Sequence, residues 1–180
     1  HSYSSAASDV YKRQQLCLMT AQIANGGYKI YPQILADEND KEKPLDKFTP
    51  LYENSKNIRI VQDAMYASTN EVRGTSYRSR INDPKYQFAG KTGTAQVKKI
   101  TKQERELDLK TFEIPYEQRD HALYVAFGPY ENPRYALSII VEHGGNGSTT
   151  AAPMAKELFK LIIDRHKIRQ SMDNKKYLEV

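Results

Sequence analysis

The chain has 180 residues, of which 39% are hydrophobic and 27% charged, a composition that fits one folded domain with a buried core. Its net charge of +5 comes from 27 basic and 22 acidic residues that are interleaved along the chain. Without a compact basic stripe, this balance argues against nucleic acid as a partner. One cysteine excludes an internal disulfide, and four widely spaced histidines predict no metal site.

The two ends of the chain differ in composition from its middle. Residues 1–14 are small and polar, with neither the basic start nor the apolar stretch of a signal peptide. We interpret them as an unrelated tail or a cloning scar. Residues 170–180 are interpreted as a polar tail, which leaves residues 15–169 as the folded part. No apolar run is long enough to span a membrane.

The first helix is expected over residues 15–25. Leu16, Met19 and Ile23 recur at helical spacing and would share one face. The pair Gly26-Gly27 follows directly and is a strong stop signal, because a glycine accepts the left-handed conformation that often ends a helix.

A short strand, a loop and a second helix come next. Residues 28–31 predict a strand cut off by a proline, and the charged, proline-containing residues 36–50 predict a surface loop. The second helix is expected over residues 58–72, with Asn57 as its cap and Gly74 as its end. Its apolar stripe would consist of Ile58, Val61, Met65 and Val72.

Three further segments have the pattern of β-strands. Residues 87–97 form the first, and residues 121–127 and 135–142 form a hairpin around a turn rich in glycine and proline. The charged residues 98–119 between them predict an insertion, weakly helical over residues 103–109. A glycine loop at 144–147 then leads into a last helix that starts near Pro153 and ends near Arg169. The expected fold is therefore α+β, an antiparallel sheet of about three strands packed with helices.

The motif with the clearest chemistry lies in the first of these strands, where Lys91, Thr92, Gly93 and Thr94 are consecutive. Alternation along a strand places Lys91 and Gly93 on one face and the two threonines on the other. An ammonium and hydroxyls beside a bare glycine backbone favour an anion, and the amide after the glycine can donate to a developing oxyanion. The alternative is an exposed edge strand whose lysine guards against aggregation.

The longer segments around this motif resemble those of the class B penicillin-binding proteins. The resemblance is carried by residues 15–27, 88–97, 119–122, 126–129 and 141–145. Lys-Thr-Gly is one of three active-site elements of penicillin-binding proteins and serine β-lactamases. The nucleophilic Ser-x-x-Lys is missing, since no serine is followed three residues later by lysine. The resemblance therefore covers residues 15–169 as the C-terminal portion of a transpeptidase domain. The long insertion fits a transpeptidase better than a β-lactamase fragment.

The resemblance implies a role for each residue of the motif. Lys91 would orient the proton relay of the nucleophile, and Thr92 and Thr94 would hold the carboxylate of a donor stem peptide or of a β-lactam. The amide of Thr94 would supply half of an oxyanion hole, with Gly93 giving the substrate room to lie against the strand. No cofactor or metal is implied, because a serine relay does the chemistry.

Two other constellations are tempting. Ser55-Lys56-Asn57 matches the Ser-x-Asn element of the same family, but its position at the start of a helix is explained by capping. Glu142 and His143 put a carboxylate and an imidazole beside the glycine loop, but no serine or cysteine is placed against them. Both are interpreted as structural.

The resemblance also implies a function for the parent protein. Such a parent cross-links peptidoglycan stem peptides through a serine acyl-enzyme, binds β-lactams, and works with a polytopic glycosyltransferase at the periplasmic face of the inner membrane. The chain itself is expected to be inactive. The alternative from another class is a non-catalytic module that binds peptide or cell-wall carboxylates.

An energetic expectation follows from the same resemblance. The family's fold pairs the outer edge of the last strand with an upstream strand, so the apolar edge at residues 136–141 would be unpaired here. An exposed edge of this kind favours aggregation, and we expect marginal stability of the chain alone.

Overall fold

The computed structural model describes residues 2–34, 49–97 and 109–178 of the chain. Its main elements, in chain order, are α1 (Ser2–Ala24), α2 (Ser55–Asn70), β1 (Ala89–Ala95), β2 (His121–Gly128), β3 (Tyr135–Val141) and α4 (Ala152–Leu178). The three strands form one antiparallel sheet in the order β1-β2-β3, which confirms the expected α+β class and the β2–β3 hairpin.

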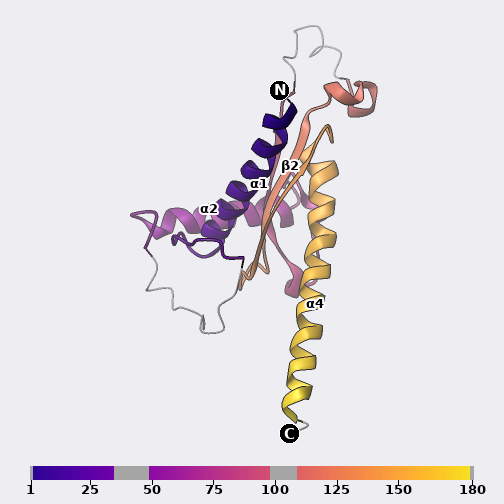
Figure 1. Cartoon of the computed structure of the whole chain (residues 1–180). Coiled ribbons are helices and arrows are strands. Elements are labelled where there is room, and N and C mark those ends of the chain that lie inside the picture. The colour runs from indigo at the N-terminus through magenta and orange to yellow at the C-terminus, as the bar shows by residue number, and fades with distance from the viewer. Residues whose placement is uncertain (1, 35–48, 98–108, 179–180) are drawn as a thin grey trace.

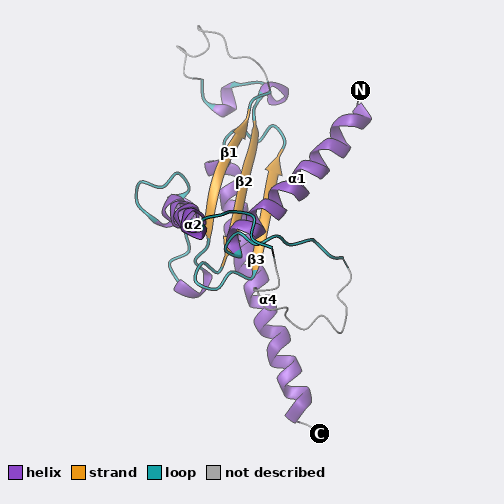
Figure 2. Ribbon diagram, turned by 90° about the vertical axis from the view of Figure 1, so that its left-hand side faces the viewer, coloured by secondary structure: helices purple, strands orange, loops and turns teal. Residues whose placement is uncertain are grey.

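The helices cover the two faces of this sheet unequally. Figure 1 shows α1 and α2 on one face and the long α4 on the other. In Figure 2, α2 is seen nearly end-on beside β1, whereas α1 crosses in front of β3. The strand that carries the Lys-Thr-Gly motif therefore lies at the edge of the sheet next to α2.

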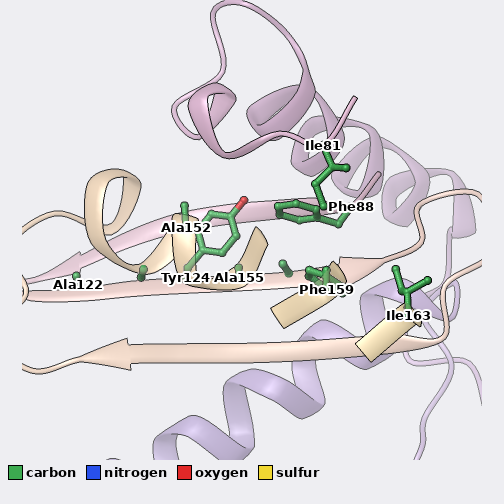
Figure 3. Close-up of a cluster of buried hydrophobic side chains, with 10 residues drawn as sticks. Ile81, Phe88, Ala122, Tyr124, Ala152, Ala155, Phe159 and Ile163 are labelled. Atoms are coloured by element: carbon green, nitrogen blue, oxygen red, sulfur yellow. The ribbon is translucent and has the colours of Figure 1, made fainter. Parts of the chain in front are cut away.

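The main core lies between the sheet and α4. Phe88, just before β1, stacks on Phe159 of α4 with ring centroids 4.8 Å apart. It also meets Tyr124 of β2 edge-on, at 6.5 Å. All three side chains are fully buried, and Figure 3 shows them together between the strands and the helix. Alanines at 122, 152 and 155 fill the narrow space around these rings, so α4 approaches the sheet closely.

A smaller cluster packs α2 and the end of α1 on the opposite face. Met65 of α2 is buried against Ala89 and Phe127, with Ile23 of α1 at its side. The amide nitrogen of Gln62 also donates to the carbonyl of Ile23 at 2.7 Å, which ties the two helices together. This cluster fixes the height of α2 above β1.

The second helix starts earlier than expected, at Ser55. Its cap is Asn54, whose side chain accepts from the backbone N–H of Lys56 at 3.0 Å, so the prediction of Asn57 as cap was wrong. The expected stripe holds only in part, because Val61 is exposed and Val72 lies beyond the helix and is 79% exposed. Ile58 and Met65 are buried as expected.

Both long terminal helices extend past their expected ends. Helix α1 begins at Ser2 rather than Gln15, and α4 continues to Leu178 rather than ending near Arg169. Local propensity explains this, since neither segment contains a glycine or proline that would break a helix. Among the described helices, none is both long and apolar enough to cross a lipid bilayer.

The segment expected to be a strand at residues 28–31 is not one. Tyr28 makes a single antiparallel bridge with Pro50, and the neighbouring residues are irregular. A strand needs a partner on at least one side, and among the described residues this segment makes only the one bridge. Most of the predicted loop at 36–50 and of the predicted weak helix at 103–109 lies outside the described residues.

Strand β3 forms the other edge of the sheet, and no described strand pairs with its outer side. Helix α1 packs against it, and all seven residues of β3 are only half-buried. The thiol of Cys17 on α1 lies 3.5 Å from the carbonyl oxygen of Ala136, and its partial burial raises its pKa. The cysteine therefore serves as packing between α1 and β3, as its apolar surroundings in the sequence indicate.

Candidate functional site

The Lys-Thr-Gly motif lies in the middle of β1, on the side of the sheet where no described strand follows. Lys91 pairs with Val125 and Gly93 with Leu123, whereas Thr92 is opposite the buried Tyr124. The two faces therefore alternate as expected. Lys91 and Thr94 are exposed and the two residues between them are half-buried, so the motif is accessible along its outer edge.

The ammonium of Lys91 bends back onto its own strand. Its Nζ donates to the carbonyl of Thr92 at 2.8 Å and lies 3.4 Å from the Thr92 hydroxyl. Because an ammonium only donates, the Thr92 hydroxyl accepts in this contact. Charge and hydroxyl are thus directed to one place although their residues are on opposite faces of the strand.

A row of hydroxyl groups continues from Thr92 toward α2. Thr75 Oγ1 lies 3.4 Å from Thr92 Oγ1 and 3.1 Å from Ser68 Oγ on the last turn of α2. We call Ser68, Thr75 and Thr92 the outer hydroxyl chain. Sequence patterns do not identify Thr75 and Ser68, because no spacing motif marks them and only the fold brings them to β1.

The turn that follows α2 holds the outer hydroxyl chain in position beside β1. The N–H and the hydroxyl of Ser76 both donate to the carbonyl of Ser68 at 3.0 Å. A Cβ on Gly74 would come within 2.3 Å of the same carbonyl oxygen, so only glycine allows the turn to lie this close to the helix. Thr75 is thereby held beside β1.

A second group of hydroxyls lies directly beneath. Tyr124 Oη is 3.0 Å from both Thr69 Oγ1 and Ser76 Oγ, and all three residues are buried. We call Thr69, Ser76 and Tyr124 the inner hydroxyl triad. Burial raises the pKa of Tyr124, and its side-chain hydrogen bonds with Ser76 and Thr69 offset part of that rise. A Cβ on Gly90 would lie 2.3 Å from Tyr124 Oη, so the triad directly supports the strand just before Lys91.

A mainly apolar cavity of about 620 Å³ opens beside Lys91 on the face covered by α1 and α2. Its walls include Met19, Val61, Met65, Val125, Thr75 and Lys91. The ammonium and the Thr75 hydroxyl are thus at the rim of a hydrophobic hollow. An anionic group with an apolar neighbour would find both kinds of surface here.

The far end of the motif is supported from the α4 side. Gly147, at the start of the turn into α4, packs on the sheet so closely that a Cβ would come within 2.6 Å of the Gly93 carbonyl oxygen and 2.4 Å of that of Leu123. The glycine loop at 144–147 therefore packs directly against the backbone of Gly93, an approach that the missing side chain of Gly147 allows. Thr94, next along the strand, is exposed.

The two alternative constellations lie at the start of α2 and at the end of β3. Ser55 and Asn57 are exposed in the first turn of α2, whose cap is Asn54. His143 has a left-handed backbone with φ of 53°, and its side chain and amide bind Arg119 and His121. The fold brings His121 and His143 together although they are distant in sequence. Within the described part of the chain, no three metal-ligating side chains form a cluster.

Comparison with known proteins agrees with this geometry. Residues 2–160 match the model of the penicillin-binding protein transpeptidase domain, a range that includes part of the segment expected to be an unrelated tail. A peptidoglycan D,D-transpeptidase MrdA from Salmonella typhimurium is 38% identical over 58% of this chain and 16% of its own length. MrdA from Acinetobacter baumannii is 32% identical over 81% of this chain and 21% of its own. The chain thus spans about a fifth or less of these relatives.

Solved structures give the same answer. Penicillin-binding protein 2 (PBP2) of Helicobacter pylori, in its complex with MreC, superimposes with a TM-score of 0.62 at 29% identity, over 82% of this chain and 24% of that one. PBP2 of Pseudomonas aeruginosa in complex with WCK 5153 gives 0.56 at 31% identity, over 79% and 28%. With the Lys-Thr-Gly strand at an open sheet edge and a family match over most of its length, the chain belongs to the penicillin-binding protein transpeptidase family.

Proposed function

We propose that this chain is the C-terminal portion of a peptidoglycan D,D-transpeptidase, and that it carries the wall that binds the substrate carboxylate. The observation that supports this most is the convergence of Lys91 Nζ and the Thr92 hydroxyl at the open edge of β1. An ammonium and a hydroxyl at one point match a carboxylate, which accepts several hydrogen bonds. Residues 170–180 are proposed to be a polar tail, whereas the family match from residue 2 argues against a domain boundary at residue 15.

The proposed roles follow the order of the residues on the strand. Lys91 orients the proton relay and adds positive potential, and Thr92 and Thr94 donate to the carboxylate of a donor stem peptide or a β-lactam. The amide of Thr94 donates to the oxyanion of the tetrahedral intermediate. Gly93 leaves the space in which the peptide lies against the strand.

The outer hydroxyl chain can orient the hydroxyl hydrogen of Thr92 toward a ligand. A hydroxyl has one hydrogen to donate, and Thr92 already accepts from Lys91. If Ser68 donates to Thr75 and Thr75 to Thr92, the single hydrogen of Thr92 is left for the ligand. Each donor in such a row polarises the next. The 3.4 Å spacing between Thr75 and Thr92 is long for a hydrogen bond and would shorten when an anion draws the row forward.

The acylation step needs a nucleophile that this sequence does not contain. No serine has a lysine three residues later, so the proposed parent supplies both the nucleophile and the second motif from another segment. The chain alone would then bind but not react. In the complete enzyme, the serine attacks the D-Ala-D-Ala carbonyl, D-alanine leaves, and the amine of a neighbouring stem peptide resolves the acyl-enzyme. No metal or cofactor takes part in this proposal.

The proposed setting is the periplasmic face of the inner membrane, as part of the machinery that elongates the cell wall. The support is the similarity to MrdA and to the H. pylori PBP2, which is solved in a complex with MreC. Peptidoglycan stem peptides, β-lactams and a polytopic glycosyltransferase are the proposed partners of the parent.

Two measurements on the purified chain test the proposal. Intact-mass spectrometry after incubation with benzylpenicillin should show no adduct. NMR titration with a peptide ending in D-Ala-D-Ala should shift the amides of residues 91–94, and the same peptide amidated at its C-terminus should not. A stable adduct would contradict the absence of a nucleophile. Equal shifts with the two peptides would contradict carboxylate recognition.

A second function is favoured by the missing Ser-x-x-Lys alone: a non-catalytic module that holds peptide or cell-wall carboxylates. The two functions separate when the chain is mixed with the upstream part of a PBP2 transpeptidase domain. Recovery of benzylpenicillin acylation in the mixture supports the transpeptidase portion. Carboxylate binding without any recovery of acylation supports the module.

A further inference from the structure

Two histidine side chains, His121 and His143, meet at the end of the sheet beside the motif. Their ring centroids are 4.8 Å apart, and the backbone N–H of His143 donates to Nδ1 of His121 at 2.9 Å. Nδ1 of His143 lies 3.1 Å from the carbonyl oxygen of Arg119. A carbonyl only accepts, so this nitrogen of His143 carries a hydrogen, whereas Nδ1 of His121 must be bare.

The two contacts respond differently to protonation. An imidazolium carries hydrogen on both nitrogens and cannot accept. Protonation of His121 therefore turns its contact with the His143 amide into an encounter of two donors. His143 already donates through Nδ1 and keeps its bond to Arg119 in either charge state. Only the neutral form of His121 is compatible with the observed geometry.

The contact that would be lost holds a strained residue. His143 has φ of 53°, a left-handed conformation that is unfavourable in a residue other than glycine. The glycine loop that follows it, residues 144–147, is held by bonds that do not titrate. The N–H of Gly145 donates to the carbonyl of Asp120 at 2.8 Å, and the hydroxyl of Thr150 donates to that of Gly144 at 2.8 Å. The His121 acceptor is thus the pH-sensitive point of attachment of this loop among the described residues.

The loop leads directly to the Lys-Thr-Gly strand. Gly147 packs on the backbone of Gly93, and His121 itself is the cross-strand partner of Ala95, one residue after Thr94. We propose that His121 is a pH-sensitive latch: in its neutral form it holds His143 at the start of the glycine loop, and its protonation frees that end of the loop and loosens the packing of the loop on the strand at Gly93 and Thr94. This holds whether or not the chain acts as a transpeptidase portion.

The sign of the response follows from the hydrogen bonds alone. The other charged or titratable groups on the described segments around the two rings are Tyr116, Glu117, Arg119, Asp120 and Glu142. Asp120 is occupied through Oδ1 by the N–H of Val97 at 3.1 Å. Since histidine changes charge between about pH 5 and 8, the response is expected in that range.

The test is an NMR titration of the full 180-residue chain from pH 8 to pH 5. We expect the amides of His143, Gly147 and Gly93 to shift in one transition that follows the ring of His121. The hydrogen-exchange protection factor of the His143 amide should fall by about tenfold or more, the equivalent of one lost hydrogen bond. Protection of core amides such as that of Tyr124 should stay unchanged.

Three variants isolate the acceptor. His121→Asn places an oxygen close to the position of Nδ1 and does not titrate, so the loop should stay protected at every pH. His143→Asn tolerates the left-handed backbone and removes the second imidazole, so the transition should persist. His121→Phe removes the acceptor, and the loop should be unprotected even at pH 8.

Four results would overturn the latch. The first is a transition that survives in His121→Asn, and the second is its loss in His143→Asn while the ring of His121 still titrates. The third is an unprotected His143 amide in the original chain at pH 8. The last is a simultaneous loss of protection at Tyr124, which would make the change global acid unfolding.

Discussion

The outer hydroxyl chain and the inner hydroxyl triad are built from adjacent residues but differ in environment. Ser68 precedes Thr69 on α2, Thr75 precedes Ser76 in the turn, and the third members are cross-strand partners on β1 and β2. In the inner triad every hydroxyl is buried among protein partners. In the outer chain Thr75 is exposed and Thr92 is half-buried, so the hydrogen of Thr92 can reach a ligand. Exposure, rather than residue type, separates the supporting group from the candidate binding group.

The largest effect is expected from Gly90→Ala, which drives a methyl group into the inner triad. The new Cβ would lie 2.3 Å from Tyr124 Oη, whose ring is held in the core and cannot retreat. Overpacking of this kind costs about 1 to 3 kcal/mol of unfolding free energy, which chemical denaturation would measure. Gly93→Ala is the matched control on the same strand. Its Cβ would meet only Leu123 Cβ, at 3.2 Å, and a cost equal to that of Gly90→Ala would contradict the assignment.

Tyr124→Phe removes one hydroxyl from the inner triad and should cost about 1 kcal/mol. The loss is moderate because the other two members keep backbone partners, Thr69 at the carbonyl of Met65 and Ser76 at that of Ser68. The denaturant midpoint should fall less in Tyr124→Phe than in Gly90→Ala. An unchanged midpoint would show that the triad does not support the strand.

The contrast between the two groups also explains what the sequence could predict. Local patterns identified the antiparallel strands, the hairpin and the place of Lys91 on a strand, because alternation and turn residues are encoded within a few positions. They could not place Thr75 or Ser68 beside Thr92, since those contacts depend on the angle at which α2 meets the sheet. The same holds for His121 and His143, which only strand pairing brings together.

Helix ends were the other weak point. Asn57 satisfied the pattern of a cap, but the helix begins at Ser55 behind Asn54, because two asparagines three residues apart offer the same signal. The starts and ends of α1 and α4 were placed by polarity, whereas helix propensity continues through such segments when no breaker stands in the way. The ends of these helices could therefore not be placed from local sequence patterns.

In the outer chain, Thr75→Val should weaken carboxylate binding without a measurable loss of stability. Valine keeps the shape of threonine but cannot donate to Thr92, so the affinity for a D-Ala-D-Ala peptide should fall by about three- to tenfold. Thr75→Ser restores the hydroxyl and should restore binding. NMR titration gives the affinity, and denaturation gives the stability. Equal affinity in Thr75→Val would remove Thr75 from the proposed site while leaving Lys91 and Thr92 in it.

The smallest effect concerns tyrosine ionisation. It compares Tyr124 of the inner triad with Tyr130, which is half-buried. Burial raises the pKa of Tyr124, and burial together with a hydrogen bond to Asp63 raises the pKa of Tyr130 to about 12. An unfolded tyrosine has a pKa of about 10, so the folded chain favours the protonated phenols. Their contribution to stability is complete below about pH 10 and is lost as the pH rises from there toward 12.

Denaturation midpoints measured from pH 9 to pH 12 would show this loss. Tyr130→Phe and Asp63→Asn should each reduce the alkaline slope, because both weaken the preference for the protonated phenol. The slope due to Tyr124 should persist in both variants and vanish in Tyr124→Phe. If Tyr124 ionised as readily as an exposed tyrosine, the inner triad would have to be open to water. The inner triad would then not be a buried supporting group, and burial would no longer distinguish it from the outer hydroxyl chain.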